Sequence, residues 1–419
     1  MGTLWKIAYR NVWRHKRRTA ITGVVLCVGI GLFIMADSML VGMDRLTIDN
    51  MVDYTESFLK LRTPEYVANL AGTPLAHGIP DPAAAAKALA AADPRISAVT
   101  PRTRFVARVS NYVEEIPVVA TAVDPERDAA VFRIAASVGA GRWLEAGATR
   151  SVVMGAALAS ELGLGLGDSV LVAANTAYEN VNADEYAIVG LLETPIPEIN
   201  QSAVYVSYAD ADGLLGIDGL VTELCAAAAR PPTFAALLSG SAGAAAAAAK
   251  ALPGLEADSI GELAQGYLAM RQMKGKFSQI LILVVLLIAG VGIVNTVLMS
   301  VYARIREIGV LRAYGMRPRE IRRLFTLEGV IVGFFGSAAG VALGLLLVWY
   351  LVAVGIPLEA FLGKIDMGGI PLAGTMRGEW NLGTAAVGLV FGLVVSFVSA
   401  RIPAKRAARL EVTDALRFA

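Results

Sequence analysis

The chain has 419 residues, of which 56% are apolar and 17% are charged, so it is more apolar and less charged than soluble proteins usually are. This composition excludes a mainly disordered chain and favours a membrane protein with a sizeable aqueous part. The 37 basic and 36 acidic residues nearly cancel, which excludes the strong positive field of a typical nucleic-acid-binding protein. The two cysteines and two histidines are too widely spaced to form a zinc site together.

Four apolar runs are long enough to cross a membrane, which takes about 20 residues. We predict membrane helices at residues 19–41, 277–301, 325–354 and 382–401. The first run follows a basic, amphipathic helix at residues 1–18. Because no clear cleavage site comes after this first run, we interpret it as an uncleaved anchor and not as a signal peptide.

Lysine and arginine counts predict the orientation, because these residues concentrate in cytoplasmic segments. Residues 1–18 hold six of them and no acid, and residues 302–324 hold seven arginines against two glutamates. We therefore expect both of these segments and the tail, residues 402–419, to be cytoplasmic. Residues 42–276 and 355–381 then lie on the other side of the membrane.

The 42–276 region alternates strand-like and helix-like patterns, which predicts a large α+β domain inserted between the first and second membrane helices. Its order fits an outer α/β unit, at about 42–123 and 220–276, with a β-rich unit at about 124–219 inserted into it. Cys225 is the only cysteine of the region, which excludes an internal disulfide. The predicted strands are 57–62, 103–110, 115–123, 151–154, 168–174, 185–192, 203–208 and 221–228, and the predicted helices are 82–92, 155–162 and 233–250.

No group of residues in this domain indicates catalysis. His77 stands alone in a segment rich in glycine and proline, where a solvated side chain is the simplest interpretation. The spacing of the carboxylates does not favour a hydrolase that uses two of them. The acids that we expect to be surface charges are Asp124, Glu126, Asp128, Glu179, Asp184 and Glu185.

The most informative segment connects the second and third spans. The second span is predicted to continue as a helix toward Gly315, which can end it, and Pro318 suits the first turn of the next helix. Ile321, Leu324 and Phe325 recur with helical spacing and predict a buried face. Such a basic hairpin is either an anchor among lipid headgroups or a docking element for a cytoplasmic motor.

This segment resembles the FtsX-like/MacB-type permeases of ATP-binding cassette transporters. Residues 307–316 read E-I-G-V-L-R-A-Y-G-M, and residues 321–329 read I-R-R-L-F-T-L-E-G. The entry segment at 8–19 and the patterns between 122 and 168 are also similar to that family. The tail motif at 403–417 agrees as well, except that Val412 stands where the family usually has a proline.

The resemblance implies a bacterial inner-membrane permease that works as a homo- or heterodimer with two copies of a separate cytoplasmic ATPase. ATP and Mg would bind to that ATPase, because this sequence has no G-x-x-x-x-G-K-[ST] motif and its chain is expected to be non-catalytic. Such permeases convert ATP-driven closure into movement of the outer domain, which is called mechanotransmission. The residues that carry over as the ATPase-coupling element are Glu307, Ile308, Gly309, Leu311, Arg312, Ala313, Gly315 and Met316, with Ile308, Leu311 and Met316 expected to insert into the ATPase.

Three branches of the family differ in substrate. The lipoprotein-releasing branch extracts lipoproteins from the inner membrane, the MacB-type branch exports periplasmic peptides, toxins or drugs, and the FtsX-type branch regulates cell-wall hydrolases. The methionine-rich exit of the first span is most similar to the lipoprotein-releasing branch. A ligand sensor that regulates a partner is an alternative of a different class.

A substrate cleft is expected at the outer ends of the first two spans. Flexible methionine side chains adapt to acyl chains, and Asp37 either caps a helix or faces a lipidated N-terminus. Membrane lipids and a lipoprotein or other periplasmic substrate are therefore the expected ligands. The candidate residues are Met35, Asp37, Met39, Leu40, Phe277, Ile280 and Leu281.

Overall fold

The computed structural model describes residues 2–14, 16–70, 74–178, 180–357 and 375–409. Parts of the prediction lie outside these residues, among them residues 1 and 15 of the entry helix, Glu179, most of the 355–381 connection, and the end of the tail from residue 410, with its D-A-L-R motif. The chain forms two compact units. The membrane unit comprises Met1–Met43, Met270–Ile356 and Met376–Ala419, and the extramembrane unit comprises Asp44–Ala269 and Pro357–Thr375.

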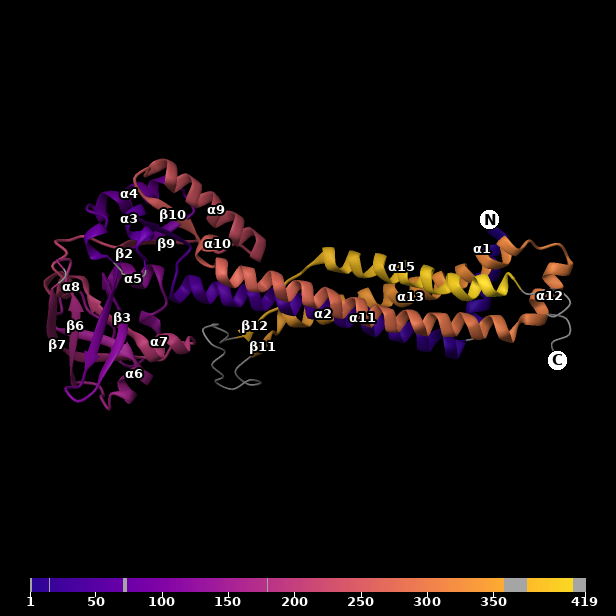
Figure 1. Cartoon of the computed structure of the whole chain (residues 1–419), viewed down its shortest axis with the longest axis horizontal. Helices are drawn as coiled ribbons and strands as arrows, with labels where there is room; N and C mark the ends of the chain where they lie inside the picture. The colour runs from indigo at the N-terminus through magenta and orange to yellow at the C-terminus, as the bar shows by residue number, and fades with distance from the viewer. Residues whose placement is uncertain (1, 15, 71–73, 179, 358–374, 410–419) are drawn as a thin grey trace. The chain divides into compact units, whose positions relative to one another are not determined.

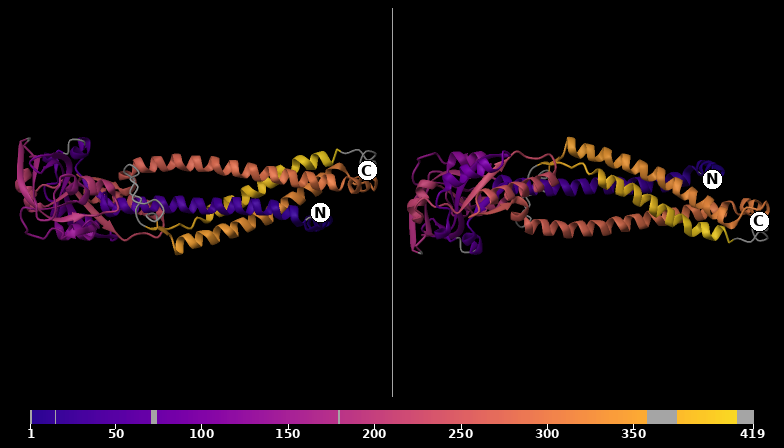
Figure 2. Two further views of the ribbon diagram at one scale, coloured as in Figure 1. Left: turned by 90° about the horizontal axis from the view of Figure 1, so that it is seen from below. Right: turned by 90° about the horizontal axis from the view of Figure 1, so that it is seen from above.

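Six helices account for the described part of the membrane unit (Figure 1), and two of them, α2 and α11, extend beyond its boundary. Four are membrane helices: three contain windows long and apolar enough to cross a membrane, and the other, α11, has an apolar stretch at Gly290–Ala303 among its described residues. Figures 1 and 2 show α1, α12 and the C-terminal end of α15 at the same end of this unit. The helices are α1 (Gly2–Arg14), α2 (Lys16–Tyr54), α11 (Gln265–Ala303), α12 (Ile305–Ala313), α13 (Pro318–Ala353) and α15 (Leu382–Ala407).

Small residues let the membrane helices approach closely. A Cβ atom added to Gly340 of α13 would lie 2.9 Å from the carbonyl oxygen of Cys27 in α2. One added to Gly333 would overlap the side chain of Ser396 in α15. These glycines therefore allow helices of the same chain to pack closely. In lipid the hydrophobic effect does not drive helices together, so the van der Waals contacts that small residues permit stabilise the bundle.

Length and composition alone would also select α9 (Phe234–Ala251) as a membrane span. This helix belongs to the extramembrane unit and contacts α4 and β10. Its buried residues include Phe234, Leu237, Ala244 and Ala248, and they form one face. Its hydropathy reflects its many alanines, and we assign it to the extramembrane core because it covers a sheet.

The extramembrane unit is built, over its described residues, on one ten-stranded sheet. Two-residue strands β11 (Ile356–Pro357) and β12 (Thr375–Met376) form a separate ladder. The ten strands are β1 (Leu59–Arg62), β2 (Ile96–Ser110), β3 (Glu115–Val123), β4 (Val138–Gly141), β5 (Ser151–Gly155), β6 (Ser169–Asn175), β7 (Val181–Leu192), β8 (Ala203–Ser207), β9 (Glu223–Ala228) and β10 (Glu256–Ser259). The α-helices of the unit are α3 (Pro64–Ala68), α4 (Pro82–Ala92), α5 (Pro125–Val131), α6 (Ala156–Glu161), α7 (Pro197–Ser202), α8 (Tyr208–Leu215), α9 and α10 (Ile260–Leu263).

Part of this sheet closes into a six-stranded barrel. The pairings run β2–β3–β8–β5–β7–β6, and β6 pairs again with β2. The long strand β2 joins the barrel to the open part of the sheet, because its residues 96–102 pair with β9 and its residues 107–110 pair with β6. The predicted unit boundary at residue 123 therefore falls between two strands of one barrel.

The predicted local structure is largely confirmed. Ser110 pairs with Glu115 across the hairpin turn, and Asp81 caps α4 by accepting a hydrogen bond from the N–H of Ala84. The short helices α5, α7 and α8 and strand β10 are not predicted from the sequence. Each of these elements has eight residues or fewer, which is too short for a clear hydrophobic period.

Candidate functional site

The predicted coupling segment contains a short helix, α12, that is separate from the second span. The sequence predicts a continuous helix here, but the structure interrupts it at Arg304, whose φ of −128° leaves the helical region. The Arg304 guanidinium is held by two carboxylates, at 2.7 Å from Glu307 and 3.0 Å from Glu328. The break thus lies where a charged side chain turns back to bind its neighbours.

Gly315 ends α12 as predicted. Its φ of +92° lies in the left-handed region, which glycine enters without strain. The Met316 N–H donates to the Leu311 carbonyl at 3.1 Å, and the Gly315 N–H donates to the Arg312 carbonyl at 3.0 Å. These two bonds form a Schellman motif, and Pro318 then opens α13.

One face of α12 and of the start of α13 is buried in the membrane unit. Ile308 is 2% exposed, and Phe325 is 1% exposed. They share one core with residues of α2, α11 and α15, so Ile308 of α12 belongs to the same core as residues of all four membrane helices. The core consists of Leu26, Ile293, Val297, Val301, Ile308, Ile321, Phe325, Ala400, Ala404 and Ala407, with Met316 packed against it.

This packing leaves no exposed side chain at Ile308 to insert into a partner, whereas the predicted insertion of Leu311 and Met316 stays a prediction. Ile308 and Met316 are engaged with their own chain, and Leu311 is half-buried. The exposed apolar side chains are Val310 (42% exposed) and Tyr314 (88% exposed), which stand four residues apart and so share a face. The sequence-based prediction misses both, although the helical spacing from Ile308 could have placed them opposite the buried face.

The other predicted coupling residues divide in the same way. Glu307 and Ala313 are exposed, Arg312 is half-buried, and Gly309 is buried. Exposed residues of α12 and its end form one ridge, which consists of Glu307, Val310, Ala313 and Tyr314.

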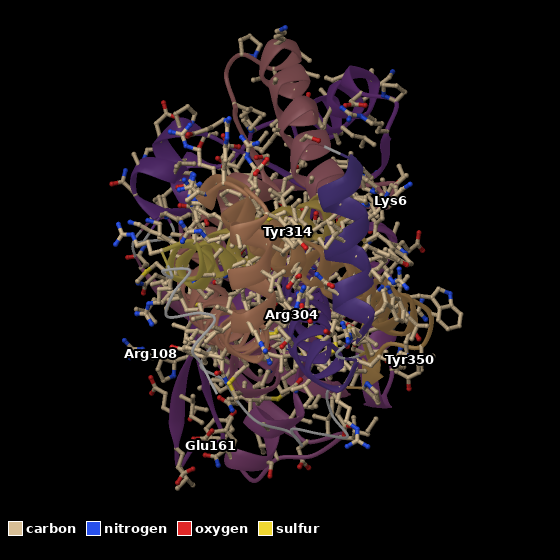
Figure 3. All side chains as sticks on the ribbon, turned by 90° about the vertical axis from the view of Figure 1, so that its right-hand side faces the viewer. Lys6, Arg108, Glu161, Arg304, Tyr314 and Tyr350 are labelled. Carbon is tan, nitrogen blue, oxygen red and sulfur yellow. The ribbon has the colours of Figure 1, made fainter. Side chains whose placement is uncertain are left out.

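Glu328 of α13 is 5% exposed, and its side chain links α1, α11 and the start of α12 through hydrogen bonds. Its carboxylate accepts hydrogen bonds from Asn11 of α1 at 2.7 Å, Arg304 at 3.0 Å and Ser300 of α11 at 3.3 Å. A buried carboxylate needs such partners, because an unpaired one is costly. Figure 3 views this end of the molecule and labels Arg304 and Tyr314.

A small cavity of about 40 Å³ lies beside Glu328. It has room for a few water molecules, which need at least 10–15 Å³ each on this scale. Its walls combine hydroxyl groups with apolar side chains from α1, α2, α11 and α13. The lining residues are Asn11, Val12, Thr19, Thr22, Ile293, Thr296, Val297, Ser300, Ala303, Glu328, Gly329 and Val332.

At the opposite ends of the membrane helices, Asp37 connects α2 to α15. Its carboxylate accepts hydrogen bonds from Asn381 at 3.0 Å and from Thr384 at 2.6 Å. Asn381 is itself the N-cap of α15. Asp37 thus supports a helix start, which is one of the two roles expected for it, and its place in a substrate cleft stays a prediction.

The remaining cleft candidates are not gathered into a described site. Met35 and Leu40 are half-buried, whereas Met39 and Ile280 are exposed. The side chains of Phe277 and Leu281 lie outside the described ones. Because none of these residues lines the cavity beside Glu328, the cleft stays a prediction.

The extramembrane unit contains a buried ion pair that the sequence does not predict. Asp128 is fully buried, which corrects its assignment as a surface charge, and it accepts two hydrogen bonds from Arg102 at 2.6 and 3.0 Å. The Arg102 guanidinium also lies 3.3 Å from the centre of the Phe132 ring. No local pattern around Asp128 predicts this pair, because its partner is 26 residues away.

A second buried ion pair lies on strands β1 and β9. Lys60 binds Glu223 at 3.1 Å, and its other partner is Glu56 at 2.8 Å. Burial raises the pKa of the Glu223 carboxyl, but Lys60 and the nearby arginines outweigh it, so the pKa lies below its ordinary value. Burial also raises the pKa of Cys225 to about 12, so its thiol is unreactive at neutral pH.

The described residues include no group of three or more potential metal ligands. His77 is exposed, as expected, and both cysteines are free.

Two family models match the chain. Residues 19–252, more than half of it, match the MacB-like periplasmic core domain, and residues 279–412 match the FtsX-like permease C-terminal model. The chain belongs to the FtsX-like and MacB-like permease family of ABC transporters. The extramembrane unit is accordingly the periplasmic domain of this family.

Relatives come from two groups. The lipoprotein-releasing system transmembrane protein LolC of Neisseria meningitidis serogroup B is 25% identical over 64% of this chain and 65% of its own length. LolC of Xylella fastidiosa is 24% identical over 80% of each chain. The macrolide export ATP-binding/permease protein MacB of Hyphomonas neptunium is 37% identical over 31% of this chain and 17% of its own length. The chain thus covers between about a sixth and four fifths of the length of these three relatives.

Proposed function

We propose that this chain is the membrane subunit of an ABC transporter that works by mechanotransmission in the bacterial inner membrane. A separate cytoplasmic ATPase, which carries ATP and Mg, docks on the exposed ridge of α12, and both ends of the chain face the cytoplasm. A second permease chain, identical or related, completes the complex. The periplasmic domain moves in response to the ATPase.

The observation that supports this proposal is the two-sided nature of α12. Its outer side exposes Val310 and Tyr314, while its inner side packs Ile308 into a core formed by four membrane helices. Because protein cores are close-packed, a push on the outer side displaces the helices beneath it. An exposed ion pair between Glu307 and the ATPase adds only about 0.2–1 kcal/mol to the binding free energy. The apolar contacts of Val310 and Tyr314 therefore contribute most of the docking.

The substrate class we propose is lipoproteins extracted from the inner membrane for transfer toward the outer membrane. The support is the alignment with LolC of Xylella fastidiosa over four fifths of both chains. MacB-type export of periplasmic peptides, toxins or drugs is the second candidate. It is favoured by the higher identity, 37%, with MacB of Hyphomonas neptunium over 131 residues.

Purification of the tagged chain from its native membrane tests the proposal. We expect an ATPase with a Walker A motif to co-purify, and a complex in proteoliposomes to release a labelled lipoprotein when ATP is added. Release of a labelled peptide or drug instead would favour the MacB-type role. Co-purification of a kinase, or of a cell-wall hydrolase without release, would favour a sensor or an FtsX-type role.

Variants of α12 test the coupling assignment. Gly309→Pro should break α12 and lower ATPase binding at least tenfold, whereas Arg312→Glu, which reverses one charge, should lower it by about two- to fivefold. Tyr178→Ala, which changes an exposed tyrosine of the periplasmic domain, is the matched control. Normal ATPase binding and transport by both α12 variants would contradict the assignment.

A further inference from the structure

Helix α1 presents three distinct faces. Its inner face carries Ala8, which is fully buried, and Val12, and both pack against α13 residues such as Leu324. The Asn11 side chain on this face donates to Glu328. α1 is therefore fixed to the membrane unit, and the orientation of its other faces is defined.

A second face is a row of aromatic side chains. Trp5, Tyr9 and Trp13 recur every four residues, and they are 51%, 42% and 54% exposed. The Tyr9 and Trp13 ring centres lie 6.3 Å apart, so these two rings form one surface. Three large aromatic side chains in a row would be unfavourable in water, because their apolar area remains hydrated.

A third face is basic and lies next to the aromatic one. Lys6, Arg10 and Arg14 each follow one of the aromatic residues in the sequence, and all three are exposed. Arg14 also lies 3.8 Å from Glu307 in a solvent-exposed pair. Figure 3 labels Lys6 on α1 at this end of the membrane unit.

The combination of these two faces matches a membrane interface better than a protein partner. Tryptophan and tyrosine concentrate at the headgroup level, where one end of each ring is apolar and the other is hydrated. Basic residues beside them attract anionic headgroups. The membrane helix α2 begins at Lys16, directly after α1, which places α1 at the membrane surface.

We propose that α1 is a binding site for anionic phospholipids. Trp5, Tyr9 and Trp13 insert at the boundary between headgroups and acyl chains, and Lys6, Arg10 and Arg14 bind the phosphates. This proposal rests on the membrane location of the family and is independent of the ATPase-docking role.

Tryptophan fluorescence of the full chain in nanodiscs tests the proposal. A variant with Trp143→Phe, Trp349→Phe and Trp380→Phe keeps only the two tryptophans of α1. We expect lipids brominated near the headgroup to quench its emission at least twofold more strongly than lipids brominated near the acyl terminus. If this variant does not fold, the quenching lost on Trp5→Phe and Trp13→Phe in the natural sequence gives the same information.

Charge variants test the anionic preference. The number of phosphatidylglycerol molecules that co-purify from nanodiscs of phosphatidylcholine and phosphatidylglycerol should fall at least twofold for Lys6→Gln, Arg10→Gln and Arg14→Gln combined. Three exposed arginines of the periplasmic domain, Arg108, Arg127 and Arg142, changed to Gln are the matched control and should have no effect. Equal numbers of co-purified phosphatidylglycerol molecules for the α1 variant and the control variant would overturn the proposal. So would the absence of quenching by any brominated lipid.

Discussion

The periplasmic domain and the α12 end of the membrane unit use charged residues in opposite ways. In the periplasmic domain, Arg102 and Asp128 are both almost fully buried and satisfy each other with two hydrogen bonds. At the α12 end, Arg304 bridges a buried carboxylate, Glu328, and a half-exposed one, Glu307. The first arrangement satisfies two charges inside a domain core, and the second connects an exposed helix to a buried carboxylate.

This difference agrees with the proposed mechanism, in which the ATPase acts on α12 and the periplasmic domain moves as one piece. Breaking a buried pair leaves an uncompensated charge in a medium of low dielectric, and this is costly. Changing an exposed residue usually alters the free energy of unfolding by only about 0.5 kcal/mol or less. The two regions should therefore respond differently to matched substitutions.

The largest effect is expected at the buried pair. Arg102→Ala should lower the free energy of unfolding of the periplasmic domain by about 3–5 kcal/mol, because Asp128 is left buried and unpaired. The fluorescence of Trp143, whose ring lies 5.6 Å from that of Tyr205, reports on this core during urea unfolding. A loss below about 1 kcal/mol would mean that the pair does not fix the domain.

An intermediate effect is expected in the membrane unit. Gly340→Val should destabilise it by about 1–3 kcal/mol, because the added side chain meets the backbone of α2. Gly292→Val is the control, since its added Cβ meets no described atom within 4 Å. Thermal unfolding in detergent should separate the two variants, and equal melting temperatures would show that close packing at Gly340 is not required.

A smaller, pH-dependent effect is expected at Glu223. Its folded-state pKa lies below the ordinary 4.5, so its contribution to stability is complete above pH 4.5 and is lost as the pH falls through the lowered value. The natural chain should therefore lose more stability between about pH 5 and pH 3 than Glu223→Gln does, as measured by urea unfolding at each pH. Parallel pH profiles for the two chains would show that Glu223 does not contribute to acid sensitivity.

The smallest effect is expected at an exposed pair on the barrel hairpin. Arg108 and Glu115 lie 3.2 Å apart, and their side chains are 69% and 52% exposed. Arg108→Ala should change the free energy of unfolding by about 0.2–1 kcal/mol or less. A loss comparable to that of Arg102→Ala in the same urea experiment would erase the contrast between buried and exposed pairs.

Sequence patterns predict most of the architecture because periodicity and turn residues act locally. The hairpin at 103–123, the cap at Asp81 and the end of α12 at Gly315 all follow from neighbouring residues. Barrel closure and the partner of Asp128 depend on residues far apart in the chain, which one sequence does not reveal. The same limit explains why the sequence assigns Ile308 to a partner: its burial depends on Ala400, Ala404 and Ala407 of α15, which are distant in the chain.

Docking of an ATPase on α12 can be tested by a photo-crosslink from the exposed surface of this helix. A benzoylphenylalanine at position 314, placed in native membranes, should form an adduct with an ATPase subunit, and the yield should change when ATP is trapped. The same probe at Tyr350, another exposed tyrosine near the other end of α13, should form no such adduct. An adduct with periplasmic proteins from position 314, or equal ATPase adducts from both positions, would contradict docking on α12.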